Sequence, residues 1–169
     1  MSHNFTGIIL KGHYEPQVAN LYDLIAIPLG FDLNLFPIDH YYSAYWQYKL
    51  KTEGYLKGAP KTGDLYHSII FPEEAVIATL VEQITARSYS LFTIIVTDYF
   101  GGIGSQWARL YSGHDLIEKQ INSISEALRF LGVIAKPGLD EFDTVGLDKI
   151  RSLPDYLEKY GDWNSDLDL

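Results

Sequence analysis

The 169-residue chain contains no cysteine. Disulfide bonds, a thiolate nucleophile and a cysteine-ligated zinc site are therefore excluded. Basic residues are also scarce, with 13 Lys and Arg against 22 Asp and Glu, which gives a formal net charge of −9. Because nucleic-acid-binding proteins usually present a basic surface, we expect no nucleic-acid partner. The acidity suits a basic protein partner instead.

A long apolar run is missing as well. No stretch approaches the ~20 apolar residues that a membrane-spanning helix needs, and residues 1–12 lack the basic region and cleavage site of a signal peptide. We therefore expect a cytoplasmic protein with no membrane partner. With 47% hydrophobic and 21% charged residues, the composition is globular. The length suits one domain over residues 1–169.

Apolar periodicity predicts an α+β fold. We expect a mixed sheet of four or five strands, with helices packed mainly on one face. The expected strands are 5–11, 31–37, 90–98, 105–112 and, as an optional fifth, 66–71. The expected helices are 16–27, 73–87 and 115–131.

The centre of the expected sheet is a hairpin over about residues 90–112. Residues 91–97 are almost all apolar, which predicts a strand buried on both faces. Glycines at 101, 102 and 104 follow, and residues 106–112 then alternate between apolar and polar. This order favours a turn between two antiparallel strands.

The same glycines allow two further interpretations. Gly102 and Gly104 match the start of the dinucleotide fingerprint G-x-G-x-x-G, but its last position is Trp107 and a strand follows, so nucleotide binding is disfavoured. Alternatively, the bare backbone amides of the turn, together with Asp98 and Gln106, form a small polar niche. That niche would consist of Asp98, Gly101, Gly102, Gly104 and Gln106.

Aromatic residues are concentrated in residues 41–55, where we favour a helix over a strand. At helical spacing, one face carries Tyr41, Tyr45 and Tyr48, and an adjacent face carries Tyr42 and Trp46. Tyr and Trp are enriched at interface hot spots because they offer rigid area with a polar tip. An interaction surface and ordinary packing on the sheet are equally compatible with this pattern.

Residues 140–169 carry a net charge of −6. We expect this acidic segment to wrap the domain, with a short docked helix near Leu153–Tyr160 and a partly frayed end. Asp140, Glu141 and Asp143 are candidates to extend the tyrosine-rich interaction surface.

No catalytic or cofactor-binding signature is complete. The five histidines form no metal-binding pair, although His40 or His67 could line a cleft. The run Asp162–Asp168 resembles the start of a calcium-binding loop but lacks its glycine and its final glutamate. We therefore assign no catalytic residue, metal or cofactor.

Three stretches carry a resemblance: TDYFGGIGSQWARLY (97–111), INSISEALRFLGV (121–133) and DEFDTVGLDKI (140–150). Together they resemble a group of small bacterial proteins that share a DYFGGxGxQ turn and a DEFDxxGL segment. The resemblance implies a shared fold and a bacterial source, and it brings no activity with it. It also implies that the glycine turn, Gln106 and residues 140–143 belong to one structural unit.

Two functional hypotheses follow. The first is a non-catalytic protein-binding module, for example an immunity or inhibitor protein for a bacterial toxin, and it requires a contiguous acidic and aromatic surface. The second is a small-molecule binding domain or enzyme with a cleft near the 98–106 turn. The sequence favours the first and leaves the oligomeric state open.

Overall fold

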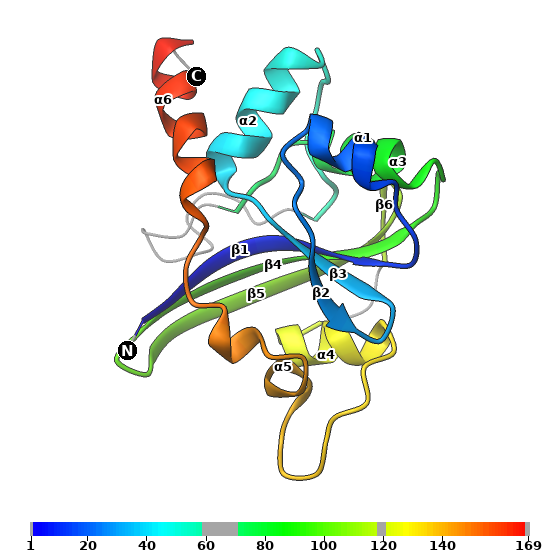
Figure 1. The fold of residues 1–169 in the computed structure, drawn as a ribbon, viewed down its shortest axis with the longest axis vertical. Coiled ribbons are helices and arrows are strands. Elements are labelled where there is room, and N and C mark those ends of the chain that lie inside the picture. Colours follow the sequence, from blue (N-terminus) through cyan, green and yellow to red (C-terminus); the bar gives the residue numbers. More distant parts are fainter. Residues whose placement is uncertain (1, 59–70, 118–120, 168–169) are drawn as a thin grey trace.

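The computed structural model describes residues 2–58, 71–117 and 121–167 (Figure 1). Its core is a six-stranded sheet in the order β2-β3-β1-β4-β5-β6, in which each neighbouring pair of strands is antiparallel. The strands are β1 (Ser2–Lys11), β2 (Ile27–Gly30), β3 (Leu33–Pro37), β4 (Leu91–Phe100), β5 (Ile103–Ser112) and β6 (Asp115–Leu116).

Helices lie on both faces of this sheet. The α-helices are α1 (Pro16–Leu21), α2 (His40–Lys49), α3 (Val76–Thr85), α4 (Ile124–Phe130), α5 (Glu141–Thr144) and α6 (Glu158–Asp166). Two 3₁₀ turns, η1 (Leu147–Lys149) and η2 (Asp155–Leu157), complete the described part. In Figure 1, helices α1, α2, α3 and α6 lie above the sheet, and α4 and α5 lie below it.

Alternating side chains of β4 divide the core into two. Phe92, Ile94 and Val96 pack with α1, α2, α3 and α6, whereas Ile95 packs with α4 and the residues of η1. Because both faces of β4 are covered, its sequence is apolar without alternation, and the expectation of a strand buried on both faces is confirmed. The hairpin is confirmed as well, and it turns at Gly101 and Gly102, which both have positive φ.

The sheet is larger than expected, and it is antiparallel where a mixed sheet was expected. The additional strands are residues 27–30, which follow directly on the expected helix and include its last residue, and residues 115–116, which were expected to begin a helix. α1 ends at Leu21 and the chain reverses at Asp23, which has φ 53°, so Pro28 and Gly30 lie in an edge strand and do not end a helix. In the second segment, the helix starts only at Ile124, where Ser123 caps it by accepting a hydrogen bond from the Glu126 N–H.

The expectation of helices mainly on one face is wrong for a related reason. The segment after β6 and the acidic segment supply α4 and α5, which cover the second face with Ile124, Ala127 and Leu128. A sheet whose central strands are apolar on both sides requires such a second cover. The optional strand at 66–71 falls largely on residues 66–70, which lie outside the described residues.

The acidic segment joins the two faces. β3 pairs only with Gly7–Lys11 of β1, so the first half of β1 has no β3 partner. Beside it, the Arg151 carbonyl accepts a hydrogen bond from the Asn4 N–H at 2.9 Å, and Leu153 packs against both cores. The chain then continues into α6, which extends to Asp166.

None of the helices in the described ranges has the length and apolarity that crossing a membrane requires.

Two glycines with the same backbone conformation provide a test of the packing at one end of the sheet. Gly113 and Gly101 have φ of +60° and +61°, but a Cβ at Gly113 would lie 2.0 Å from the Ser88 carbonyl oxygen, whereas one at Gly101 would meet nothing within 4 Å. We expect Gly101→Ala to lower the free energy of unfolding by about 1 kcal/mol through left-handed strain alone. Gly113→Ala should lower it by roughly 2 kcal/mol more, because the backbone must also move. Urea denaturation of both variants measures this difference, and equal losses would contradict the close approach.

Candidate functional site

An aromatic surface lies where α2 and α6 run side by side above the sheet (Figure 1). We call Tyr41, Tyr45 and Tyr48 of α2 and Trp163 of α6 the aromatic ridge. The Tyr45 and Trp163 rings stack at 4.8 Å between centroids. Tyr41, Tyr48 and Trp163 are exposed, at 43%, 53% and 37%. The expectation that Tyr41, Tyr45 and Tyr48 share a helical face is consistent with this geometry.

Beneath the ridge, a buried polar network fixes α6 against the domain. The Tyr160 hydroxyl donates to Asp23 Oδ2 at 2.5 Å and accepts from Trp46 Nε1 at 3.1 Å. Tyr42, fully buried, donates from its hydroxyl to the Tyr22 carbonyl at 2.6 Å. Burial, followed by the hydrogen bond to Asp23, raises the pKa of Tyr160 well above that of an ordinary tyrosine. The Tyr160 side chain beneath the ridge is therefore a neutral phenol that is hydrogen-bonded on both sides, by Trp46 and by Asp23.

The outer face of α6 is acidic. Glu158, Asp162 and Asp166 are exposed, and none of them forms an ion pair with another residue in the described part of the chain. The nearby cation Lys159 pairs with Asp23 at 2.8 Å and lies 5.3 Å from the Trp163 ring centroid. Lys49 lies 5.6 Å from the Tyr45 ring centroid. The ring faces of the ridge thus already attract cations within the chain.

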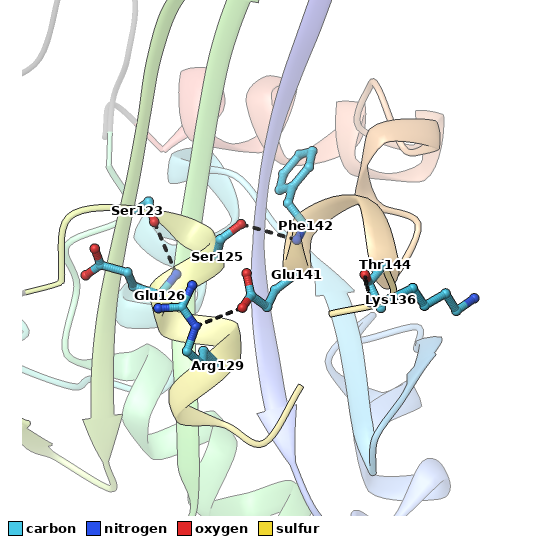
Figure 2. Close-up of polar contacts among 8 residues, drawn as sticks. All are labelled: Ser123, Ser125, Glu126, Arg129, Lys136, Glu141, Phe142 and Thr144. Carbon is cyan, nitrogen blue, oxygen red and sulfur yellow. Dashed lines mark hydrogen bonds and ion pairs between the residues drawn. The ribbon is translucent and has the colours of Figure 1, made fainter. Parts of the chain in front are cut away.

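The acids that were expected to extend this surface are placed elsewhere. Asp140, Glu141 and Asp143 belong to α5 and its N-cap, on the opposite face of the sheet from α2 (Figure 1). Glu141 Oε1 accepts from Arg129 Nε at 2.8 Å, a pair shown in Figure 2, and this bond lowers the pKa of Glu141. Asp140 Oδ1 accepts from the Asp143 N–H at 2.8 Å and caps α5. The Glu141 carboxylate therefore joins α5 to α4, the Asp140 carboxylate caps α5, and these acids do not extend the tyrosine surface.

Hydrogen bonds other than the ion pair also join α4 to α5. Figure 2 shows the Phe142 N–H donating to Ser125 Oγ at 3.3 Å, close to the Glu141–Arg129 pair. The Lys136 N–H donates to Thr144 Oγ1 at 3.0 Å, which fixes the connection that leads into α5. The two short helices therefore form one unit on this face.

The expected niche around the glycine turn is divided by the sheet. Asp98 pairs in register with Ser105, and Gln106 pairs with Thr97, so Asp98 and Gln106 point to opposite faces. Gly101 and Gly102 lie at the exposed tip of the hairpin. At Gly104 an added Cβ would lie 1.8 Å from the Asp98 carbonyl oxygen, so this glycine permits close strand pairing. The structure does not bring these five residues into one niche.

Gln106 instead lines a cleft of about 230 Å³ between the sheet and α5. We call it the His3 cleft, and it is lined by His3, Tyr99, Gln106, Ser125, Asp140, Phe142, Asp148 and Arg151. Gln106 is a bridge, accepting from the Ile124 N–H at 2.7 Å and donating to the Tyr99 hydroxyl at 3.1 Å. The glutamine therefore joins the hairpin to the start of α4.

The chemistry of the His3 cleft favours binding over catalysis. His3 Nε2 lies 2.8 Å from the Leu147 carbonyl, which can only accept, so this nitrogen carries the proton. Its Nδ1 lies 2.7 Å from Thr97 Oγ1 and is also occupied. The remaining groups are hydroxyls, carboxylates and the Arg151 guanidinium, which makes no ion pair within the described ranges. No nucleophile is paired with a free base here.

His40, one of the two candidate histidines, does not line this cleft. His40 is half-buried in the first turn of α2 and its ring contacts Tyr41 at 4.0 Å between centroids. Burial lowers the pKa of His40, against the opposing effect of Asp39. His67 lies outside the described residues. Within the described ranges, His, Asp and Glu form no group of three or more that could hold a metal ion.

Sequence reasoning missed the residues that complete the ridge and its base. Trp163 of α6 stacks on Tyr45 of α2, and Asp23, which follows α1, accepts from Tyr160 of α6. The helical spacing of Tyr156 and Tyr160 indicated a docked helix, but no local pattern identified α2 as its partner. The expected fraying is also limited, because Asn164 Nδ2 of α6 donates to the Tyr41 carbonyl of α2 and to the Tyr160 carbonyl of its own helix.

No protein-family model matches the chain, and no match was found among curated proteins or among solved structures. The resemblance carried by the glycine turn and residues 140–150 therefore stays a prediction. Membership of Gln106 and Asp140 in one structural unit is nevertheless consistent with their shared cleft.

The base of the ridge can be tested by removing one oxygen atom. We expect Tyr160→Phe to lower the free energy of unfolding by about 2 kcal/mol, because Trp46 Nε1 and Asp23 each lose a buried partner. Tyr48→Phe is the matched control and should change it by less than about 0.5 kcal/mol, since Tyr48 is 53% exposed and its hydroxyl has no bond to a described residue. Urea denaturation followed by tryptophan fluorescence gives both values. A Tyr160→Phe variant as stable as Tyr48→Phe would contradict a stabilising network.

Proposed function

We propose that this chain is a non-catalytic protein-binding module that binds a basic protein through the aromatic ridge and the acidic face of α6. The observation that carries the proposal is the exposure of Trp163 on α6, which also carries three exposed acids that form no ion pair with the described residues, together with the exposure of Tyr48 on the neighbouring α2. An immunity or inhibitor protein for a bacterial toxin is the specific form that we favour.

The geometry supports rapid and specific binding of a basic partner. Exposed acids steer an oppositely charged protein toward the surface, and a net charge of −9 adds a long-range attraction. Rings that stack within the free protein, as Tyr45 and Trp163 do, lose little further side-chain freedom on binding. Arginine and lysine of a partner can then occupy ring faces, as Lys49 and Lys159 do within the chain.

A second candidate function is small-molecule binding in the His3 cleft. The observation in its favour is the convergence of Tyr99, Ser125 and Arg151, whose hydroxyl and guanidinium donors have remaining capacity. A volume of about 230 Å³ limits the ligand to a compact polar molecule. Because both ring nitrogens of His3 are already hydrogen-bonded, binding without turnover is the simpler form of this function.

The ridge proposal predicts that binding depends on Tyr48 and Asp162. The double variant Tyr48→Ser/Asp162→Lys should weaken the affinity for a captured basic protein by at least about tenfold, because one aromatic contact is lost and one attraction becomes repulsion. A lysate pull-down with the wild-type chain identifies the partner, and calorimetry at two salt concentrations then measures the affinity. Higher salt should weaken binding.

The matched control is Tyr89→Ser/Asp115→Lys. It makes the same changes at two exposed positions outside α2 and α6, one just before β4 and one in β6. It should retain the partner. Equal affinities for both double variants, or a partner that binds independently of salt, would contradict the ridge as the binding surface. If the partner is a toxin, co-expression of the wild-type chain should restore growth and the ridge variant should not.

A further inference from the structure

A second and wider cleft lies where β1 ends, the β2–β3 turn begins and α3 leads into β4. Its volume is about 630 Å³. We call it the Lys11 cleft, and it is lined by Lys11, Gly12, Asp32, Arg87, Ser88, Tyr89, Ser90 and Leu91. It shares no residue with the ridge or with the His3 cleft, so neither candidate function uses it.

Two cations without carboxylate partners define its charge. Lys11 Nζ donates to the Phe31 carbonyl at 2.7 Å, and Arg87 Nη2 donates to the His13 carbonyl at 2.9 Å. Neither side chain forms an ion pair with any residue in the described ranges, although acids outnumber bases in this chain. Asp32 is the one acid of the lining, which leaves a formal charge of +1. Each cation has N–H groups in excess of its single carbonyl bond.

The backbone adds further donors. The carbonyl of Ser90 accepts from the Gly113 N–H at 3.0 Å, and that of Tyr89 accepts from Ser112 Oγ at 3.2 Å. The N–H groups of Ser88, Tyr89 and Ser90, in contrast, make no hydrogen bond to another described residue. The β5–β6 turn thus fixes this segment through its carbonyls and leaves three successive amides at the edge of the cleft available to donate to an anion.

A buried hydroxyl points to the same conclusion. Ser90 is only 7% exposed, and its Oγ has no hydrogen-bond partner among the described residues. A buried hydroxyl without a partner is costly and calls for an explanation. A phosphoryl oxygen in the adjoining cleft would accept a hydrogen bond from it.

The backbone around the cleft is strained. Phe31, Asp32 and Ala86 have φ of 55°, 60° and 55° although none is glycine. Such residues cluster at ligand sites, where the strain holds groups in place. Here the Phe31–Asp32 turn holds Lys11 through its carbonyl, and Ala86 directs the chain into Arg87.

We propose that the Lys11 cleft binds the phosphate group of a small phosphate monoester. Lys11, Arg87 and the 88–90 amides contact the phosphate oxygens, since charge-assisted bonds from arginine and lysine suit this group. The cleft is larger than a phosphate ion, and the Tyr89 ring is 71% exposed beside it. An aromatic ester group therefore stacks on Tyr89.

The test is a titration of the ¹⁵N-labelled full chain with phenyl phosphate, followed by amide chemical shifts at constant ionic strength. We expect saturable shifts at Gly12, Ser88, Tyr89 and Ser90, with a dissociation constant in the mM range or below. Lys11→Met and Arg87→Met should each weaken binding about tenfold. Asp32→Asn should strengthen it severalfold, because it removes the opposing charge.

Lys149→Met is the matched charge control and should leave binding unchanged, since Lys149 lies in η1, away from the cleft. Phenol, at concentrations at which phenyl phosphate saturates the site, should not shift the Tyr89 amide. Inorganic phosphate should bind more weakly than phenyl phosphate. Equal affinity for inorganic phosphate would overturn the monoester assignment. The phosphate site itself would be overturned by an absence of saturable shifts at about 10 mM ester, by matching shifts with chloride, or by unchanged affinity in Lys11→Met. The gain expected from Asp32→Asn keeps the test decisive if a cation variant is unstable.

Discussion

The two-sided burial of β1 and β4 is the constraint on which the rest of the structure depends. Ile8 and Leu10 of β1 pack on one face, and Phe5 and Ile9 pack on the other, as the side chains of β4 also do. Such strands are stable only if both faces are covered, so the chain must supply helices above and below one sheet. The acidic C-terminal segment meets part of this requirement on each face. Its placement follows from the apolar content of the central strands: Glu141 is buried and paired with Arg129, while the acids of α6 are exposed.

Rigid central strands also explain where the candidate sites lie. The middle of the sheet is filled by packed side chains, so polar groups can gather only at strand ends and beyond the covering helices. The Lys11 cleft forms where β1 ends and β4 begins, and the His3 cleft forms where β1 begins and β4 ends. The ridge lies on the outer side of α2 and α6. Each site therefore combines residues distant in sequence on a frame that the core holds fixed.

The sequence predicted what depends on local pattern and failed where distant contacts decide. The hairpin, α3 and the helical faces of residues 40–49 follow from periodicity and glycine chemistry, and the structure has all three. The edge strands β2 and β6 were missed because Ile27–Gly30 and Asp115–Leu116 are too short for a period, and only pairing with β3 and β5 orders them. Likewise, Asp98 and Gln106 seemed to be neighbours in a turn, but strand alternation separates them.

Left-handed residues connect the fold to the candidate sites. Among the described residues that are not glycine, Asp23, Phe31, Asp32, Lys51 and Ala86 have positive φ. Each costs about 1–2 kcal/mol relative to a right-handed conformation, so the chain must recover this energy elsewhere. Asp23 does so through Tyr160 and Lys159, and thereby fixes the base of the ridge. Phe31 recovers part of it through Lys11. Asp32 lines the Lys11 cleft together with Lys11 and Arg87 and pairs with neither. The cleft therefore keeps a formal charge of +1, which a bound anion would balance.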